Sequence, residues 1–178
     1  MIELTPMIIE EGLIENGQIK KRKTVRAIIC NENNEVLLVY SKLFDDYTFP
    51  GGGIKENESD EDALKRELHE ELGATHISIL EPIFTIDELR YGVKGSDNVY
   101  LQTSIYYQCD IHLFGRQNLQ GRELAHGITP RWVTINQAIT QNEKVLPNEL
   151  HQTKGLKTVL IRENRVLKAL KETLYEKI

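Results

Sequence analysis

Three glutamates at close helical spacing, Glu67, Glu70 and Glu71, are the residues of this sequence best suited to chemistry. At about 100° per residue, their side chains share an arc of roughly 100° on one side of a helix. Like charges at such spacings repel one another, and a hard cation such as Mg²⁺, which prefers carboxylate oxygens, would remove that repulsion. The spacing therefore favours a metal site, although a solvated acidic face is the commoner explanation for an arbitrary helix.

Three consecutive glycines precede the acidic segment, in the stretch "PGGG" from Pro50 to Gly53. Because glycine has no side chain, the backbone there can turn tightly and approach a ligand closely. A glycine cluster alone is more often a loop than a ligand site. Its fixed distance from the acidic segment makes a combined metal and phosphate site the sharper hypothesis.

A single helix is predicted to carry the glutamates. Ser59 is a natural N-cap with acidic residues in the turn that follows, and Gly73 is a natural stop at the C-terminal end. A core-facing stripe recurs every four residues and lies directly beside the glutamates; it consists of Leu64, Leu68 and Leu72. We therefore expect the carboxylates to border the hydrophobic core.

Strands are predicted on both sides of this helix. The runs "TVRAIIC" and "EVLLVY" indicate a buried hairpin, and Asn16-Gly17 indicates the turn of an opening hairpin. Further strands are expected in "HISILEPIFTID", "NVYLQTSIYYQCDIHLF" and "PRWVTI", the last leading into a short helix at "NQAITQ". With helices interleaved among them, these strands predict an α/β fold in which helices sandwich a mixed β-sheet.

Length and composition favour one globular domain. The chain has 178 residues, of which 40% are hydrophobic, so we expect a single domain over 1–178 with an N-terminal hairpin extension (1–23) and a C-terminal amphipathic helix (156–178). No apolar run reaches the length of a signal peptide or membrane span, which predicts a cytoplasmic protein without a membrane partner. Cys30 and Cys109 lie far apart in apolar runs and are expected to be buried free thiols.

The net charge indicates which macromolecules the protein can bind. A net charge of -5 argues against a nucleic-acid duplex, because such binding needs clustered Lys and Arg. The one basic run, "KKRK" from Lys20 to Lys23, is expected to be a solvated strand end or loop.

The glycines and the acidic helix together resemble a known family signature. Gly52, five residues, Glu58, seven residues and then "RELHEELGA" match every fixed position of the Nudix box, with Ala74 smaller than the usual aliphatic residue at the end. The segment "RWVTINQAI" is similar to the Trp-bearing strand and short helix that often follow the box. The resemblance implies the Nudix α/β/α sandwich and metal-dependent hydrolysis of a nucleoside diphosphate linked to another group.

The same resemblance implies roles for individual residues. Glu67, Glu70 and Glu71 would be ligands of Mg²⁺ or Mn²⁺, often joined by the backbone carbonyl of Gly52. Glu58 and Arg66 would support them, with Arg66 holding the glutamates in position as partners of metal ligands commonly do.

The proton acceptor is open between two glutamates. Glu67 is the first choice as general base for the attacking water, although family members differ and some use a glutamate from a later loop. Glu123, in "GRELAHG", is the candidate for that loop acid, and an ordinary exposed glutamate is an equally good reading of it.

The substrate is less well defined. Candidate substrate-binding residues are Arg26, Phe49 and Tyr91, although an aromatic residue is more often core or rim packing and Arg26 could equally be a strand-end charge. Tyr91 lies where dinucleoside polyphosphate hydrolases often carry a tyrosine, whereas the marks of ADP-ribose and coenzyme A hydrolases are absent. A nucleoside triphosphate or related nucleotide is the expected substrate.

Two functions from different classes are consistent with these residues. The first is the pyrophosphohydrolase, and the second is a non-catalytic nucleotide-binding regulator with the same fold. A regulator would be expected to lose box glutamates, and this sequence keeps all of them, which favours the enzyme. The two terminal extensions could cover the site or form a homodimer interface.

Overall fold

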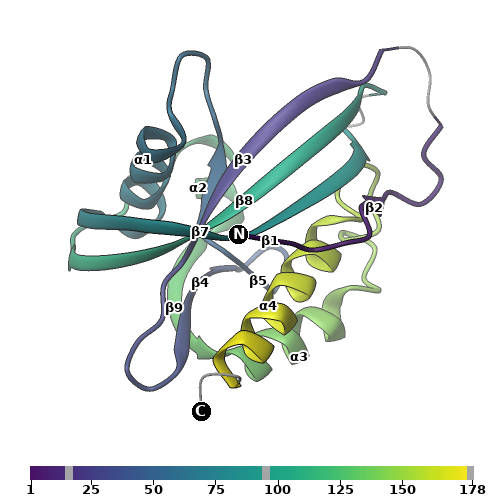
Figure 1. Ribbon diagram of the computed structural model, residues 1–178. Coiled ribbons are helices and arrows are strands. Elements are labelled where there is room, and N and C mark those ends of the chain that lie inside the picture. Colours follow the sequence, from purple (N-terminus) through teal and green to yellow (C-terminus); the bar gives the residue numbers. More distant parts are fainter. Residues whose placement is uncertain (15–17, 94–96, 176–178) are drawn as a thin grey trace.

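The computed structural model describes residues 1–14, 18–93 and 97–175, and Figure 1 labels its elements. The strands are β1 (Ile2–Glu3), β2 (Ile8–Ile9), β3 (Lys20–Ile28), β4 (Glu35–Ser41), β5 (Asp46–Thr48), β6 (Gly51–Gly53), β7 (Ala74–Tyr91), β8 (Val99–Phe114) and β9 (Ile128–Thr134). The helices are α1 (Asp60–Leu72), α2 (Gly121–His126), α3 (Ile135–Val145) and α4 (Val159–Tyr175).

Two β-sheets form the middle of the molecule. The larger is mixed and has the order β1-β7-β8-β3-β6, with β2 also paired to β7, and β8 lies parallel to β3 but antiparallel to β7. The smaller is antiparallel, with the order β5-β4-β9. The strands from the predicted runs therefore divide between two sheets.

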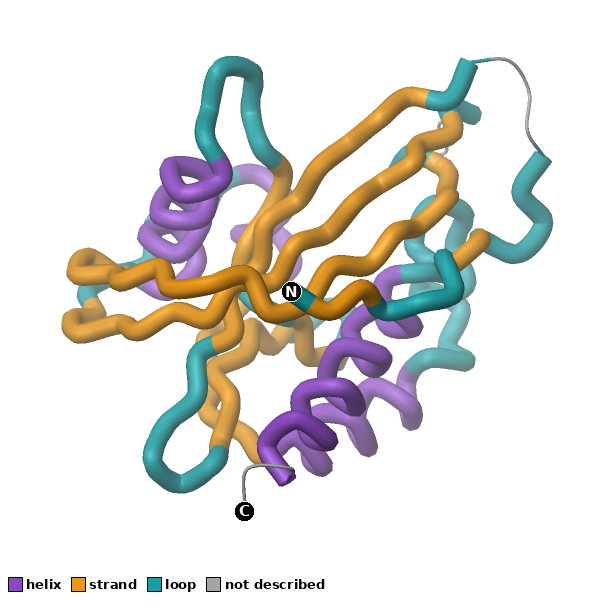
Figure 2. Tube along the Cα trace, viewed as in Figure 1, coloured by secondary structure: helices purple, strands orange, loops and turns teal. Residues whose placement is uncertain are grey.

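Helices cover the sheets on both sides. Figures 1 and 2 show α1 on one side and the α3 and α4 pair on the other. One buried cluster joins α1 to β3, β4 and β8, with Leu64, Leu68 and Leu72 from the predicted stripe at its centre. A second cluster joins α3 and α4 to the opposite faces, through residues such as Ile28, Leu38 and Leu167. The predicted α/β/α sandwich with a mixed sheet is confirmed.

The signals at the ends of α1 act as predicted. The Ser59 hydroxyl accepts a hydrogen bond from the Asp62 N–H, and three acidic residues occupy the first turn, where the helix dipole favours them. Gly73 ends the helix with a φ of 67°, a conformation that glycine adopts without steric cost. The glutamates of the box therefore lie on a regular, well-terminated helix.

The N-terminal segment differs from the prediction of an opening hairpin. β1 and β2 both pair in parallel with β7, while β3 pairs with β8 and β6. Residues 1–14 therefore extend the edge of the larger sheet instead of pairing back on β3, because β7 offers them a free edge. The predicted turn at Asn16-Gly17 lies outside the described residues. The "KKRK" run is the exposed beginning of β3, as expected for a solvated strand end.

The second predicted hairpin is confirmed only beside its turn. The Leu37 N–H donates to the Ile29 carbonyl at 2.9 Å, and Cys30 forms an isolated bridge with Val36. Beyond this point β3 and β4 separate into different sheets. Cys109 is a buried free thiol as predicted, but Cys30 is exposed, because it lies past the end of β3 where neither core cluster covers it.

α4 lies within the segment 156–178 for which an amphipathic helix is predicted, and it buries Leu160, Leu167 and Leu170. Within the described part of the chain, no helix combines the length and apolarity needed to cross a membrane.

Candidate active site

Arg66 organises the glutamates of α1. Its Nε and Nη2 donate to the two carboxylate oxygens of Glu58 at 2.7 and 2.9 Å, and its Nη1 donates to Glu67 at 2.6 Å. Nη1 also lies 3.7 Å from Glu70, and Nη2 donates to the Gly53 carbonyl at 3.2 Å. The planar guanidinium thus fixes the glycine segment and three carboxylates relative to one another.

The glycine strand β6 lies against the same carboxylates. A Cβ at Gly52 would meet the carboxyl carbon of Glu67 at 2.5 Å, so only glycine leaves room for that side chain. The Gly51 N–H donates to Glu71 at 2.8 Å, and Gly51 has a φ of 131°, which favours glycine. The glycine segment and the acidic helix are therefore in direct contact.

Glu123 is brought to this site from a distant part of the sequence. The loop after β8 is attached to the end of α1, because the Asn118 N–H donates to the Glu70 carbonyl at 2.8 Å and Gln117 Nε2 donates to the Glu71 carbonyl at 2.6 Å. The loop leads into α2, whose Glu123 accepts a hydrogen bond from the Gln120 N–H at 3.4 Å. Glu123 therefore lies on a short helix instead of a loop.

The three carboxylates Glu67, Glu71 and Glu123 form a tight group. Each offers an oxygen that lies within 4.8 Å of the other two, and Glu67 and Glu71 are buried. Burial raises the pKa of Glu71 to about 8, and the charges of Glu67 and Glu123 add to this, while Arg26 and the Gly51 N–H oppose it. Burial also raises the pKa of Glu123, reinforced by the charges of Glu67 and Glu70.

These properties fit a hard divalent cation. The donors are all oxygens, and their crowding in a partly buried place is unfavourable for carboxylates alone. Glu70 is not part of this group and lies beside Arg66 at the edge of the site.

A cavity of about 230 Å³ opens beside the carboxylates. Glu71, Glu123 and Arg26 are among the residues that line it. Arg26 donates through Nη1 to the Phe49 carbonyl at 2.8 Å, and its Nε is buried without a hydrogen-bond partner among the described residues. The cavity lining thus combines two carboxylates with a guanidinium.

The cavity is also lined by residues that sequence reasoning missed. Asp46 and His151 are both buried, with Asp46 Oδ2 3.9 Å from His151 Nδ1. Phe44 packs edge-on against His126, with ring centroids 5.0 Å apart, and lies 5.5 Å from His151. Arg162, from α4, also lines the cavity. No motif marks these residues, because they come together only through the packing of α2, β5 and the loop before α4.

Two predicted substrate-binding residues do not reach the cavity. The Phe49 side chain is fully buried in the core, edge-on to Tyr106, so it cannot stack on a base; its carbonyl serves only to hold Arg26. Tyr91 lies at the end of β7, where its hydroxyl accepts a hydrogen bond from the Ile14 N–H at 2.8 Å. Of the three predicted residues, Arg26 alone lines the cavity.

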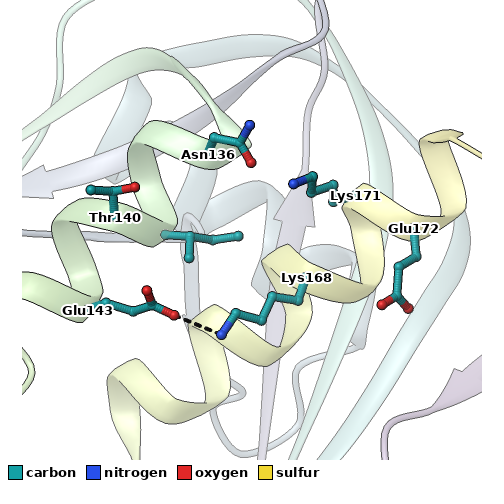
Figure 3. A pocket seen from close by; sticks show the side chains of 7 residues that line it. Asn136, Thr140, Glu143, Lys168, Lys171 and Glu172 are labelled. Atoms are coloured by element: carbon teal, nitrogen blue, oxygen red, sulfur yellow. Dashed lines mark hydrogen bonds and ion pairs between the residues drawn. The ribbon is translucent and has the colours of Figure 1, made fainter.

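A larger cavity, of about 760 Å³, lies between α3 and α4 (Figure 3). Lys168 and Glu143 form an ion pair of 2.8 Å across it, and Thr140 and Glu172 lie on its sides. None of the box glutamates lines it. The smaller cavity is therefore the one associated with the candidate chemistry.

Comparison with known proteins agrees with this geometry. Residues 20–154 match the family model of the NUDIX domain. An RNA pyrophosphohydrolase from Psychromonas ingrahamii is 46% identical over 63 residues, which are 33% of this chain and 34% of that protein. One from Hahella chejuensis is 48% identical over 52 residues, 29% of this chain and 32% of that protein. The chain thus matches about a third of the length of these curated relatives.

Solved structures show a similar fold. The solution structure of the E. coli ORF135 protein has a TM-score of 0.52 at 22% identity, covering 86% of this chain and 92% of that one. The NUDIX hydrolase from Nitrosomonas europaea has a TM-score of 0.50 at 20% identity, covering 83% and 90%. Because the family model spans most of the sequence and these structures share its fold, the chain belongs to the NUDIX domain family.

Proposed function

We propose that this protein hydrolyses a phosphoanhydride bond of a nucleoside triphosphate or related nucleoside diphosphate derivative, using Mg²⁺ or Mn²⁺. The observation that carries this proposal is the group of Glu67, Glu71 and Glu123, whose oxygens lie within 4.8 Å of one another. Glu71 and Glu123 also line a cavity that contains Arg26. Carboxylates suited to binding a metal and a guanidinium suited to binding phosphate thus line the same cavity.

Glu67 and Glu71 would hold the metal, with Glu123 beside them, and the family resemblance implies Glu70 and the Gly52 carbonyl as further ligands. The metal would neutralise phosphate oxygens and lower the pKa of a bound water. Arg66 keeps Glu67 in place through Oε1, which leaves Oε2 for other partners. Gly52 supplies the space that the Glu67 carboxylate occupies. The residues proposed to bind the metal are therefore held rigidly, as catalytic metal sites require.

Proton removal from the attacking water falls to Glu67 or Glu123. Either carboxylate lies within a few ångströms of the other, so both can reach a water placed between them. Glu67 is fixed by Arg66, whereas Glu123 is held only by the 3.4 Å contact with the Gln120 N–H. This difference in restraint favours Glu67, because a general base must be well positioned.

Arg26 is the proposed phosphate-binding residue. Its side chain lines the cavity together with Glu71 and Glu123, and a guanidinium binds phosphate oxygens through charge-assisted hydrogen bonds. The adjoining cavity of about 230 Å³ is smaller than a typical site for a whole drug-sized ligand, so it fits one ring system of the substrate. The phosphates would then lie between Arg26 and the carboxylates.

The relatives suggest one particular nucleotide. Proteins named RNA pyrophosphohydrolase are 46 to 48% identical over the matched stretches, which makes an RNA with a 5′-triphosphate a substrate to be tested beside free nucleotides. A dinucleoside polyphosphate is less favoured, because Tyr91 lies outside the cavity. The retained box glutamates favour an enzyme over a non-catalytic regulator.

The proposed setting is a cytoplasmic protein without a duplex partner. Both cysteines are free thiols, which is usual in reducing compartments. A homodimer is proposed as well, because Ile2, Ile9 and Ile14 expose 53, 60 and 65% of their surface on the N-terminal segment. Light scattering that shows a monomer at micromolar concentration would contradict the dimer.

A substrate panel with Mg²⁺ tests the activity. It comprises ATP, GTP, ADP-ribose, UDP-glucose and a 5′-triphosphorylated RNA oligonucleotide. The readout is release of phosphate or pyrophosphate from the triphosphates, and formation of AMP from ADP-ribose and of UMP from UDP-glucose. We expect turnover of at least one of them and its loss on chelation of the metal. No turnover of any of the five compounds would favour the regulator.

A further inference from the structure

The two parts of the chain that flank the family match hold each other. We call residues 1–14 the N-terminal arm, and the family match covers residues 20–154. Lys157 donates to the Glu11 carbonyl at 3.3 Å, and Arg165 donates to the Pro6 carbonyl. The arm, through β1 and β2, thus lies beside the beginning of α4 (Figure 1).

Glu10 makes the most buried of these contacts. Only 2% of its surface is exposed. Its Oε1 accepts a hydrogen bond from the Gly155 N–H at 2.7 Å, and its Oε2 accepts one from the Tyr91 N–H at 2.9 Å. One carboxylate therefore joins the end of β7 to the loop between α3 and α4.

Gly155 is held from its other side as well. Its carbonyl accepts a hydrogen bond from Arg90, itself buried, and its φ of 82° favours glycine. A Cβ at this position would lie 2.3 Å from the Gly92 carbonyl oxygen, so the loop packs closely against the end of β7. Glu10 and Arg90 together leave this part of the loop little freedom to shift.

The same loop lines the cavity beside the carboxylates. His151 and Leu156, on either side of Gly155, both line that cavity. His151 is further fixed by the contact of its Nε2 with the Phe44 carbonyl at 3.0 Å. A change in the position of Gly155 would therefore move this part of the cavity lining.

We propose that Glu10 is a positioning residue that fixes the loop wall of the cavity and so sets the affinity for the nucleotide part bound there. The proposal rests on the function proposed above, in which this cavity receives one ring system of the nucleotide. Glu10 itself touches neither the substrate nor the reacting atoms. Its loss should weaken substrate binding without changing the carboxylates that act on the phosphates.

Glu10→Ala and Glu10→Gln test this, with Glu11→Ala as the matched control. Glu11 is the exposed neighbour on the same arm, and its hydrogen bond with Lys157 uses the backbone carbonyl, which alanine keeps. With the best substrate of the panel, Glu10→Ala should raise KM by about tenfold and leave kcat within about twofold, which is the pattern of lost binding energy. The KM of Glu10→Gln should lie between those of the wild type and Glu10→Ala, because the amide oxygen keeps one of the two hydrogen bonds.

Hydrogen exchange gives a readout independent of turnover. Peptides from residues 146–158 should exchange faster in Glu10→Ala than in Glu11→Ala, with α1 unchanged. A fall in kcat at unchanged KM, or kinetics and exchange equal to those of Glu11→Ala, would overturn the proposal. If circular dichroism shows Glu10→Ala to be unfolded, Glu10→Gln decides by the same criteria.

Failure of the proposed function is separable from failure of this inference. If the wild type turns over none of the nucleotides, ADP with Mg²⁺ is titrated calorimetrically into each variant. Weaker ADP binding by Glu10→Ala than by Glu11→Ala then supports the positioning role, and equal affinity overturns it. If the wild type neither turns over nor binds a nucleotide, both proposals are wrong.

Discussion

Arg66 explains how so many acidic residues are tolerated on one turn of α1. Its guanidinium contacts Glu58 and Glu67 and lies near Glu70, so one cation offsets the repulsion among several carboxylates. The hydrogen bond from Arg66 lowers the pKa of Glu58 to about 2, which keeps that carboxylate ionised. Glu71 has no such partner and depends on the Gly51 N–H, which leaves it the residue with most to gain from a cation.

Substituting the metal-binding glutamates tests this reading. We expect Glu70→Gln and Glu71→Gln each to lower kcat by about a hundredfold or more, because the amide removes a charged ligand while keeping the shape of the side chain. Glu61→Gln, on the exposed side of the same helix, is the control and should be neutral. Full activity with Mg²⁺ in either of the first two variants, with unchanged circular dichroism, would contradict the metal assignment.

Asp46 provides a prediction about pH. Burial, reinforced by the charge of Glu163, raises its pKa to about 7, well above the value near 4 expected in the unfolded chain. Because the folded state holds this proton more tightly, the associated stability is full below pH 4 and is lost as the pH rises to about 7. Asp46→Asn should therefore flatten this decline and raise the free energy of unfolding at pH 8 by on the order of 1–3 kcal/mol.

Urea unfolding of the wild type and Asp46→Asn at pH 4, 6 and 8 measures this difference. Glu32→Gln is a suitable control, because Glu32 is exposed and is not among the groups that raise the pKa of Asp46. Parallel pH profiles for the wild type and Asp46→Asn would show that Asp46 ionises in the folded protein as it does in the unfolded chain.

At the scale of elements, β6 and α1 are built around each other. The three glycines of β6 differ in what surrounds them: Gly52 faces the Glu67 carboxylate, whereas a Cβ at Gly53 would lie 3.3 Å from the flexible end of Arg22. A side chain is therefore excluded at Gly52 by Glu67, whereas at Gly53 it needs only a small movement of Arg22.

This difference makes Gly52→Ala and Gly53→Ala a matched pair. In Gly52→Ala the new methyl group must displace Glu67, so we expect kcat to fall by about tenfold or more while the fold is kept. In Gly53→Ala the Arg22 side chain can move aside, and activity should stay within about threefold. Equal activities of the two variants would show that the position of Glu67 does not limit the reaction.

Sequence reasoning was most successful where the signals are local. Ser59, Gly73 and the leucine stripe predicted α1 because capping and periodicity act within a few residues. The family resemblance assigned Gly52 and Glu67 to one metal site, and the two residues are in contact in the structure. By contrast, Asp46 and His151 are 105 positions apart and meet only in the folded chain, and Phe49 looked like a stacking residue because burial by Tyr106 is a long-range effect. The pairing of β1 and β2 with β7 likewise depends on a distant sheet edge.

At the scale of the whole molecule, α4 contributes a buried ionic network. Arg162 donates to Glu88 at 2.8 Å and to Glu163 at 2.7 Å, and all three side chains are almost completely buried. Glu163 also accepts hydrogen bonds from the Phe49 N–H and the Tyr106 hydroxyl, at 2.6 and 3.1 Å. The helix is therefore tied to both the large sheet and the segment just before the glycines.

Removing Arg162, the central cation of this network, should lower the stability of the fold. Arg162→Ala leaves two carboxylates buried without their partner, so we expect the free energy of unfolding to fall by about 3–5 kcal/mol. Lys168→Ala, on the same helix, removes only the exposed ion pair with Glu143 and should cost about 1 kcal/mol or less. Urea denaturation monitored by circular dichroism measures both, and equal losses would contradict a structural role for the buried network.

The contacts of Glu163 and Ile8 have a practical consequence for the boundaries of this protein. Ile8 packs in the same core cluster as Val166 and Leu167, and Glu163 holds the backbone at Phe49. All of these residues except Phe49 lie outside the range 20–154 over which the family is recognised. The unit of folding is therefore larger than the range matched by the family model, and a fragment trimmed to that range would lose α4, one of the two helices in its layer of the sandwich.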